Sequence, residues 1–251
     1  MAGRVVKVWR LGRINYGDAQ KVQTALAQLH HSSPNDDTLN SMLLLEHTPV
    51  YTVGIRRKDY TEDEAERLRA TGADFYETNR GGLITFHGPG QLVAYPIINL
   101  RQFKESMRWY VCHIEKTIID LCRKFSLDAS TSPHTGVWIG DNKVCAIGVH
   151  GSRFITTHGL ALNCNVDLNW FNNIVPCGII DKGVTSLSKE ANVDISVESV
   201  IPKFLDSFSD IFRCSFVEFR EEQKDDLLTK LCIEKPRADD SVIFGSKRKQ
   251  I

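Results

Sequence analysis

Residues 80–91, Arg-Gly-Gly-Leu-Ile-Thr-Phe-His-Gly-Pro-Gly-Gln, constrain the fold of this chain more than any other stretch. Four glycines and one proline enclose a short run of β-branched and aromatic residues. Glycine has no Cβ, so it permits positive φ angles and a close approach of another backbone or of a ligand. The pattern predicts a loop, a strand from Leu83 to His87, a Gly-Pro-Gly turn and a second strand from Leu92 to Asn99. Such a unit is either a tight hairpin or a wall of bare backbone against a bound molecule.

The composition is that of a globular protein of one or two domains. The chain has 251 residues, and its 31 basic and 31 acidic side chains balance to a formal net charge of zero. No overall field therefore favours nucleic acid or an acidic membrane, and no apolar run approaches the roughly 20 residues of a membrane span. The seven cysteines are scattered and never spaced Cys-x-x-Cys. This argues against a disulfide framework and a zinc site, and it favours a reducing compartment.

Apolar periodicity predicts both helices and strands. Strands are expected at 5–11, 42–46, 137–139, 143–150 and 160–166, and helices at 15–29, 61–70, 105–125 and 197–213. Because the strands outnumber the helices and come partly as hairpins, we expect an α+β fold, in which helices flank a mixed β-sheet. A single domain is expected over 1–225, with its core at about 40–220, followed by a polar C-terminal tail at 226–251.

One cysteine, Cys177, stands in the segment Val-Pro-Cys-Gly-Ile. Pro176 restricts the backbone before it and Gly178 leaves space beside the sulfur, so the turn presents the thiol in a constrained setting. Cys177 is therefore a candidate nucleophile. Most cysteines are buried and inert, and an inert role stays open on these residues alone.

Lys143 begins the strand expected at 143–150. A lysine there is ordinarily solvated, but two catalytic roles are open to it. Its ammonium can lower the pKa of a neighbouring thiol from about 8.5. If burial lowers the pKa of the lysine itself, it can accept or deliver a proton. Strand alternation points Cys145 to the same side as Lys143, which predicts a second thiol near the site.

These segments resemble the lipoyl(octanoyl) transferases, which carry Arg-Gly-Gly, then Thr, an aromatic residue and His-Gly-Pro-Gly-Gln. Residues 44–54, Leu-Leu-Glu-His-Thr-Pro-Val-Tyr-Thr-Val-Gly, and the run from Lys143 to Leu187 also match the family. The resemblance covers the chain from about Val5 to about Phe219. It implies the fold of the biotin and lipoate protein ligases, a single catalytic domain, and an acyltransferase that needs no metal and no other cofactor.

The resemblance also implies residue roles. Cys177 would carry the acyl group, and Lys143 would be the second catalytic residue. Three segments would form the substrate wall: Arg80, Gly81, Gly82, Leu83, Ile84, Thr85, Phe86 and His87; Ala146, Ile147 and Gly148; and Gly159, Leu160 and Ala161. His158 and His87 would orient Lys143 or donate to an oxyanion, unless both are structural. An apolar slot for the acyl tail would come from Ile84, Phe86, Tyr95 and Ile147.

The implied reaction is the first step of protein lipoylation. An octanoyl or lipoyl group would pass from acyl carrier protein to Cys177 and then to a lysine of a lipoyl domain. The expected donor is octanoyl-acyl carrier protein, and the expected acceptors are the glycine cleavage H protein and the E2 subunits of 2-oxoacid dehydrogenases, with no nucleic acid or membrane partner. The first seventeen residues are basic and acid-free, which suits either a mitochondrial transit segment or simply a first strand. Resemblance to the eukaryotic members favours the mitochondrial matrix.

Three other functions remain open from the sequence. An ATP-dependent lipoate or biotin ligase would share the fold, but the chain has no Gly-Arg-Gly-Arg adenylate loop. A non-catalytic protein that binds lipoyl domains would not need both Cys177 and Lys143. A cysteine hydrolase would need a Cys-His-Asn order that the sequence does not offer clearly.

Overall fold

A mixed β-sheet forms the centre of the molecule. The computed structural model describes residues 4–56, 60–175 and 182–234. Within these ranges the sheet has eight strands: β1 Arg4–Ile14, β2 Ser41–His47, β6 Gln91–Ile97, β7 Val137–Ile139, β8 Asn142–Ser152, β9 Ile155–Asn163, β10 Gly183–Val184 and β11 Cys214–Glu218. They follow the order β10-β8-β9-β6-β2-β1-β11, and β7 pairs with β8 outside that path. Strand β1 is parallel to β2 and β11, whereas β2, β6, β9 and β8 pair antiparallel in turn, so the predicted mixed sheet is confirmed.

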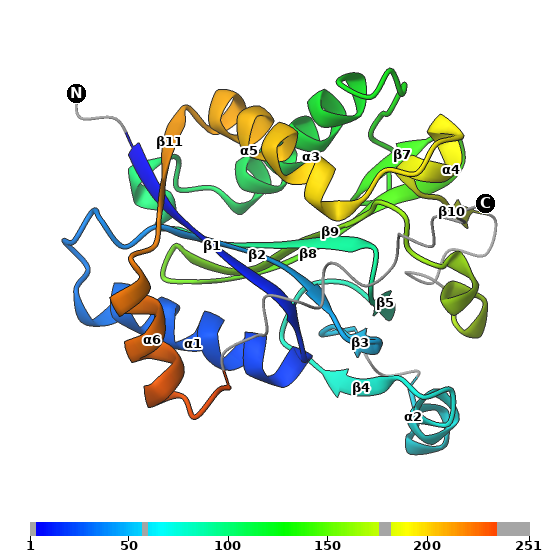
Figure 1. The fold of residues 1–251 in the computed structure, drawn as a ribbon, viewed down its shortest axis with the longest axis horizontal. Coiled ribbons are helices and arrows are strands. Elements are labelled where there is room, and N and C mark those ends of the chain that lie inside the picture. The colour runs from blue at the N-terminus through cyan, green and yellow to red at the C-terminus, as the bar shows by residue number, and fades with distance from the viewer. Residues whose placement is uncertain (1–3, 57–59, 176–181, 235–251) are drawn as a thin grey trace, which may run out of the picture.

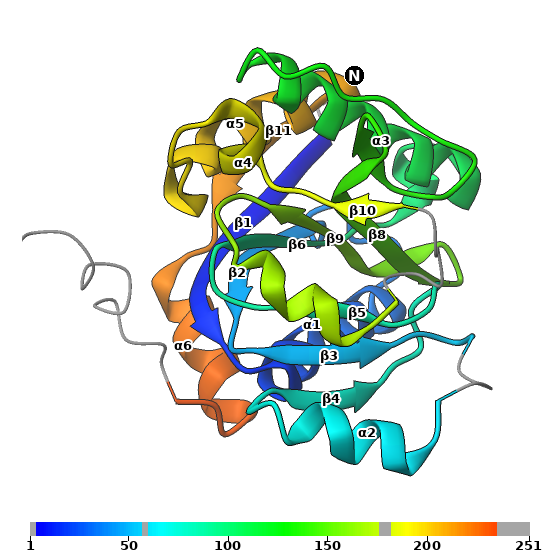
Figure 2. The same ribbon diagram turned by 90° about the vertical axis from the view of Figure 1, so that its right-hand side faces the viewer.

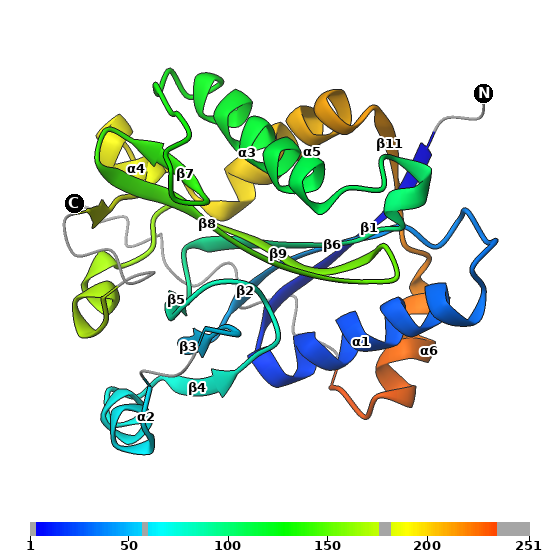
Figure 3. The ribbon, with the colours of Figure 1, turned by 180° about the vertical axis from the view of Figure 1, so that it is seen from behind.

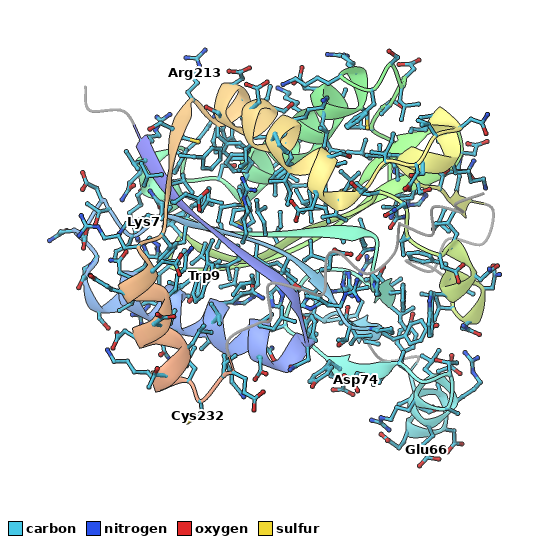
Figure 4. All side chains as sticks on the ribbon, viewed as in Figure 1. Lys7, Trp9, Glu66, Asp74, Arg213 and Cys232 are labelled. Atoms are coloured by element: carbon cyan, nitrogen blue, oxygen red, sulfur yellow. The ribbon has the colours of Figure 1, made fainter. Side chains whose placement is uncertain are left out.

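Helices cover both faces of this sheet (Figure 1). One face carries α3 Met107–Arg123, α4 Leu187–Ala191 and α5 Val197–Phe212, and the other carries α1 Tyr16–Ser32 and α6 Glu221–Lys230. Strand β2 shows why both faces are buried: Met42 and Leu44 pack under α3 and α5, and Leu43 and Leu45 pack under α1. A continuous apolar run is typical of a strand that is covered on both sides. The same two layers of side chains are visible in Figure 4, where Trp9 extends from β1 into the layer of α6.

The helices begin where the sequence places capping residues. The side chain of Asn15 accepts a hydrogen bond from Asp18 N at the start of α1, and Ser106 accepts one from Trp109 N at the start of α3. Such a cap contributes about 1 kcal/mol. The expected helices at 105–125 and 197–213 are confirmed as α3, which is two residues shorter at each end, and α5, which ends one residue earlier. Helix α6 was not expected, because its sequence is polar except for a leucine pair of which Leu228 is buried.

A second, smaller sheet lies beside the main one (Figures 2 and 3). It consists of β3 Val50–Val53, β4 Asp74–Glu77 and β5 Thr85–His87 in the order β4-β3-β5, and α2 Glu62–Arg69 precedes β4. Two short 3-10 helices, η1 Leu100–Gln102 and η2 Leu168–Asn173, complete the elements. Strand β5 pairs with β3 and not with β6, which follows it in sequence. The tight-hairpin interpretation of residues 80–91 is therefore wrong, because the Gly-Pro-Gly turn carries the chain from one sheet to the other.

The described residues contain no helix that is both long and apolar enough to cross a membrane. They also contain no group of three or more His, Cys, Asp or Glu side chains that could hold a metal ion.

Candidate active site

A pocket lies between the small sheet and the main sheet. Its walls come from the loop before β5, from β5 itself, from β6, β8 and β9, and from the first residue of α1. The empty space of the pocket, counted together with open solvent at its mouth, is about 460 Å³. The lining residues are Tyr16, Arg80, Gly82, Leu83, Thr85, His87, Tyr95, Ala146, Ile147, Gly148, His158, Gly159, Leu160 and Ala161. The three segments that the sequence predicted as a substrate wall thus meet around one cavity.

Three members of the predicted wall do not line the cavity. Because side chains alternate along β5, Thr85 and His87 face the pocket while Ile84 and Phe86 turn to the opposite side. There Phe86 stacks on Trp170 with ring centroids 4.9 Å apart. Gly81 stays close to the wall through its backbone, since its N–H donates to Val149 O at 3.0 Å. The apolar slot expected from Ile84 and Phe86 is therefore not formed by these two side chains, although Tyr95 and Ile147 line the pocket as expected.

Close backbone contacts require glycine at two positions of the wall. A Cβ on Gly148 would lie 2.9 Å from Gly81 O and 3.0 Å from Arg80 Cδ. A Cβ on Gly159 would lie 2.8 Å from Pro96 Cδ and still closer to Ala94 O. Real Cβ atoms essentially never approach a neighbour within 3.0 Å. These glycines let β8 and β9 fit closely against the loop of Arg80 and against β6.

The Arg80 side chain holds the loop around itself. Its Nη2 donates to Thr52 O at 2.7 Å, to Thr52 Oγ1 at 2.9 Å and to Leu83 O at 3.0 Å, and its Nη1 donates to Gly81 O at 3.0 Å. The guanidinium therefore ties the loop to β3 in the small sheet. Its buried positive charge also disfavours protonation of the two pocket histidines, His87 and His158.

Burial keeps two histidines at the pocket neutral, His47 behind Tyr95 and His158 in the wall. Burial lowers the pKa of His47 from 6.5 to about 4. Its Nδ1 donates to Ile14 O at 3.0 Å, and its Nε2 accepts from the Tyr95 hydroxyl at 2.7 Å. Burial, with Arg80 and His150 as lesser causes, lowers the pKa of His158 from 6.5 to about 3. Neither ring carries a positive charge at neutral pH.

His158 has an unusual backbone for a strand residue. Its φ of +56° lies in the left-handed region, which costs a non-glycine residue about 1 kcal/mol or more. Two side chains support this conformation: Gln23 Oε1 accepts from His158 N, and Asn79 Oδ1 contacts His158 Nε2, both at 2.7 Å. Nothing in the local sequence indicated Gln23 or Tyr16 as neighbours of the site, since both lie in α1, distant in the chain from residues 80–91. Asn79 directly precedes that segment, but no pattern marked its side chain.

Lys143 is buried near the end of the pocket wall, at the start of β8. Its side chain is 6% exposed, and Nζ lies 4.8 Å from the centroid of the Trp138 ring. The expectation of a solvated lysine is therefore wrong. Strand β10 runs parallel to the beginning of β8, with Val184 opposite Lys143, and Thr185 N donates to Lys143 O at 3.0 Å. Cys177, the other predicted catalytic residue, lies outside the described residues.

Cys145 is not an accessible thiol beside Lys143. The pairing of β7 with β8 shifts register between Val137 and Trp138, so one residue of β7 spans two residues of β8. Val144 and Cys145 consequently both lie in the cluster under α3, and strict alternation between Lys143 and Cys145 is lost. Burial raises the pKa of the Cys145 thiol well above its usual value. Burial likewise raises the pKa values of Cys122, Cys164 and Cys214 to about 12.

Comparison with known proteins places these features in a family. Residues 15–209 match the lipoyl protein ligase A/B catalytic domain. Over 210 residues, 84% of this chain and 93% of the relative, the chain is 59% identical to the mitochondrial octanoyl-acyl-carrier-protein:protein N-octanoyltransferase of Danio rerio. The human form is 44% identical over 221 residues, 84% of this chain and 95% of its own length. An octanoyltransferase of Caldanaerobacter subterraneus is 38% identical over 215 residues, 84% and 92% of the two chains.

The solved structures that match share the fold at low identity. Lipoate-protein ligase A bound with ATP superimposes with a TM-score of 0.68 at 14% identity, over 92% of this chain and 95% of that one. A bi-partite lipoate protein ligase from Thermoplasma acidophilum gives a TM-score of 0.68 at 15% identity, over 95% of both chains. The expected ligase-like fold is therefore confirmed.

Proposed function

Since this chain belongs to the lipoyl protein ligase A/B catalytic domain family, with octanoyltransferases among its relatives, we propose that it transfers an octanoyl group from acyl carrier protein to a lysine of lipoyl domains. It is an acyltransferase, and the transfer is the first step of protein lipoylation. The observation that carries this proposal is identity of 38% to 59% to octanoyltransferases over 84% of the chain, whereas the ligases share only the fold. The vertebrate relatives are named mitochondrial, which supports action in the mitochondrial matrix.

The acyl group is carried by Cys177. The buried thiols of the described residues, of which Cys145 lies nearest to Lys143 in sequence, have raised pKa values and would attack poorly, because the thiolate is the nucleophile. Cys177 stands six residues before Gly183, the residue that begins the strand beside Lys143. This short connection supports a pairing of the Cys177 thiol with the Lys143 amine.

The reaction has two balanced halves. In the first, Lys143 takes the Cys177 proton, the sulfur attacks the octanoyl thioester, and the carrier leaves as a thiolate that recovers the proton from Lys143. In the second, the neutral amine of the acceptor lysine attacks the acyl-enzyme, a C–N bond replaces the C–S bond, and the amine loses one proton. Lys143 returns that proton to the Cys177 sulfur. The acyl chain occupies the pocket lined by Leu83, Ile147 and Leu160.

The acceptors of this reaction are lipoyl-domain proteins, namely the glycine cleavage H protein and the E2 subunits of 2-oxoacid dehydrogenases. The donor is octanoyl-acyl carrier protein. Neither half of the reaction requires a nucleotide, because the thioester already activates the acyl group.

The test is the intact mass of the protein after incubation with octanoyl-acyl carrier protein alone. One octanoyl group should be added in the wild type and none in Cys177→Ser. The matched controls Cys145→Ser and Cys164→Ser replace buried thiols and should keep most of the transfer activity. Free octanoate with ATP should not replace the carrier. Acyl transfer from free octanoate and ATP without an acyl-enzyme would overturn the proposal in favour of a ligase.

A further inference from the structure

Three buried polar side chains form a continuous chain of hydrogen bonds, here called the relay, that leads away from the pocket. His87 Nδ1 lies 2.7 Å from Gln91 Oε1, Gln91 Nε2 donates to Asn163 Oδ1 at 2.9 Å, and Asn163 Nδ2 donates to Thr185 O at 2.8 Å. His87, Gln91 and Asn163 are 6%, 1% and 4% exposed. The relay ends beside the candidate catalytic lysine, since Thr185 N donates to Lys143 O.

Two main-chain carbonyls fix the direction of every hydrogen bond in this relay. A carbonyl oxygen only accepts, so the Asn163 group that faces Thr185 O must be its NH₂, and Asn163 Oδ1 must face Gln91. The Gln91 NH₂ then donates to Asn163 Oδ1, and it also reaches a second carbonyl, Phe86 O, at 3.3 Å. Gln91 Oε1 is therefore left to face His87, and a carbonyl oxygen there requires a proton on His87 Nδ1.

This direction determines what the pocket offers to a substrate. Burial lowers the pKa of His87 well below its usual value, so the ring is neutral and carries one proton. With that proton on Nδ1, the Nε2 atom has a lone pair and no hydrogen. Tyr95 is in a similar state, because its hydroxyl hydrogen is committed to His47 Nε2. Both side chains line the pocket as hydrogen-bond acceptors.

We propose that Gln91 and Asn163 are positioning residues that hold His87 in the Nδ1–H tautomer, so that its Nε2 accepts a hydrogen bond from the amine of the acceptor lysine. This inference rests on the proposed acyl transfer and assigns His87 to its second half. An acceptor atom cannot stabilise an oxyanion, which needs donors. It can orient an amine, because an N–H directed at Nε2 leaves the nitrogen lone pair free to attack the thioester. His87 takes no proton from the amine, and the proton that the amine loses passes to Lys143 as before.

The tautomer can be read without activity. Nitrogen-15 NMR of the histidine-labelled protein distinguishes protonated from unprotonated ring nitrogens, and the His87 signals are those missing from His87→Phe. At neutral pH we expect a protonated Nδ1 and a bare Nε2 in the wild type and in the control Asn40→Leu, which removes another buried amide. Gln91→Met should lose the fixed tautomer. A wild-type His87 with the proton on Nε2 overturns the proposal.

A second variant keeps the test decisive if Gln91→Met does not fold. In Gln91→Glu, one carboxylate oxygen still accepts from His87 Nδ1, but its negative charge favours the imidazolium. The pKa of His87 should rise, and Nε2 should gain a proton as the pH falls. The rate of the second half-reaction should then decline in mild acid with the same midpoint as the NMR titration. Protonation of His87 Nε2 in the NMR titration without any change in that pH profile overturns the role in amine orientation.

The two half-reactions separate an acceptor role from a donor role. Acylation of Gln91→Met by octanoyl-acyl carrier protein should stay within about twofold of wild type, while transfer from the preformed acyl-enzyme to a lipoyl domain should slow about tenfold, the effect of one hydrogen bond. Equal slowing of both halves would mean that His87 serves the oxyanion, and it overturns the proposal. If wild type forms no acyl-enzyme, the proposed function and the amine role fail together, whereas the NMR result still decides whether the relay sets the tautomer.

Discussion

Gly159→Ala tests the claim that the pocket wall depends on direct backbone contact between β9 and β6. The new methyl group would lie 2.8 Å from Pro96 Cδ and closer still to Ala94 O. A carbonyl oxygen and a proline ring cannot rotate away as a flexible side chain can. The two strands must therefore separate locally until the carbon reaches an ordinary contact distance.

The cost has two parts. Overpacking in a buried site costs about 1–3 kcal/mol, and the rigidity of both neighbours puts this position at the upper end. Separation of β9 from β6 also weakens one or two ladder hydrogen bonds, at about 1 kcal/mol each. Alanine restricts the unfolded chain more than glycine does, and this recovers about 0.5 kcal/mol of the free energy of unfolding. The free energy of unfolding should fall by about 4 kcal/mol, a large share of the 5–15 kcal/mol that is typical of a folded domain.

Urea unfolding followed by tryptophan fluorescence measures this change. The matched control is Gly81→Ala, whose Cβ would lie 3.5 Å from Val149 O, an ordinary contact, with no positive φ. The control should change the free energy of unfolding by less than about 1 kcal/mol. If Gly159→Ala is as stable as the control, the close contact between β9 and β6 does not shape the wall as described.

Three further predictions concern the charged and polar groups around the pocket. The pKa of His47 is about 4 in the folded state, against an ordinary value of 6.5. Between these pH values the unfolded state binds more protons, so the free energy of unfolding is highest above pH 6.5 and decreases as the pH falls towards 4. At about pH 5.5 His47 should lower the free energy of unfolding by about 1.4 kcal/mol. If urea unfolding shows the same pH dependence in His47→Asn as in wild type, the prediction is wrong. Tyr95→Phe should lower the free energy of unfolding by about 1–3 kcal/mol, because His47 Nε2 then lacks its donor; additive effects of Tyr95→Phe and His47→Asn in a double-mutant cycle would disprove the coupling. Lys143→Ala should slow acylation and move the pH midpoint of Cys177 alkylation up towards about 8.5; an alkylation profile equal to wild type would exclude this effect on the thiol.

Local sequence rules predicted the elements well and their assembly less well. Asn15 and Thr61 cap the helices that follow them, as expected, because a cap depends only on the next three residues. The buried strand at 42–46 was recognisable because both of its faces are apolar. In contrast, the sequence of the Gly-Pro-Gly turn is compatible both with a hairpin and with a connection between two sheets. Which of the two forms depends on the strand that pairs with β5, and that strand lies elsewhere in the chain.

The candidate site shows the same division. Apart from Tyr16, the residues that line the pocket were predicted as segments or singly, but their side-chain directions were not. Once β5 is known, the alternation of side chains along a strand correctly places Thr85 and Phe86 on opposite faces. At Cys145 the same rule fails, because the pairing of β7 with β8 shifts register there. The left-handed backbone of His158 is supported by a hydrogen bond to Gln23, 135 positions away, and no local pattern could reveal it.

The small sheet has a consequence for how the molecule loses activity. Its strands β4, β3 and β5 have four, four and three residues, too few to be stable without support. The same sheet supplies Thr85 and His87 to one side of the pocket, while the other side belongs to the large, doubly covered sheet. Local opening of the weaker part costs less free energy than global unfolding. The pocket should therefore come apart at denaturant concentrations where the main sheet is still intact, and inactivation should precede the cooperative unfolding transition.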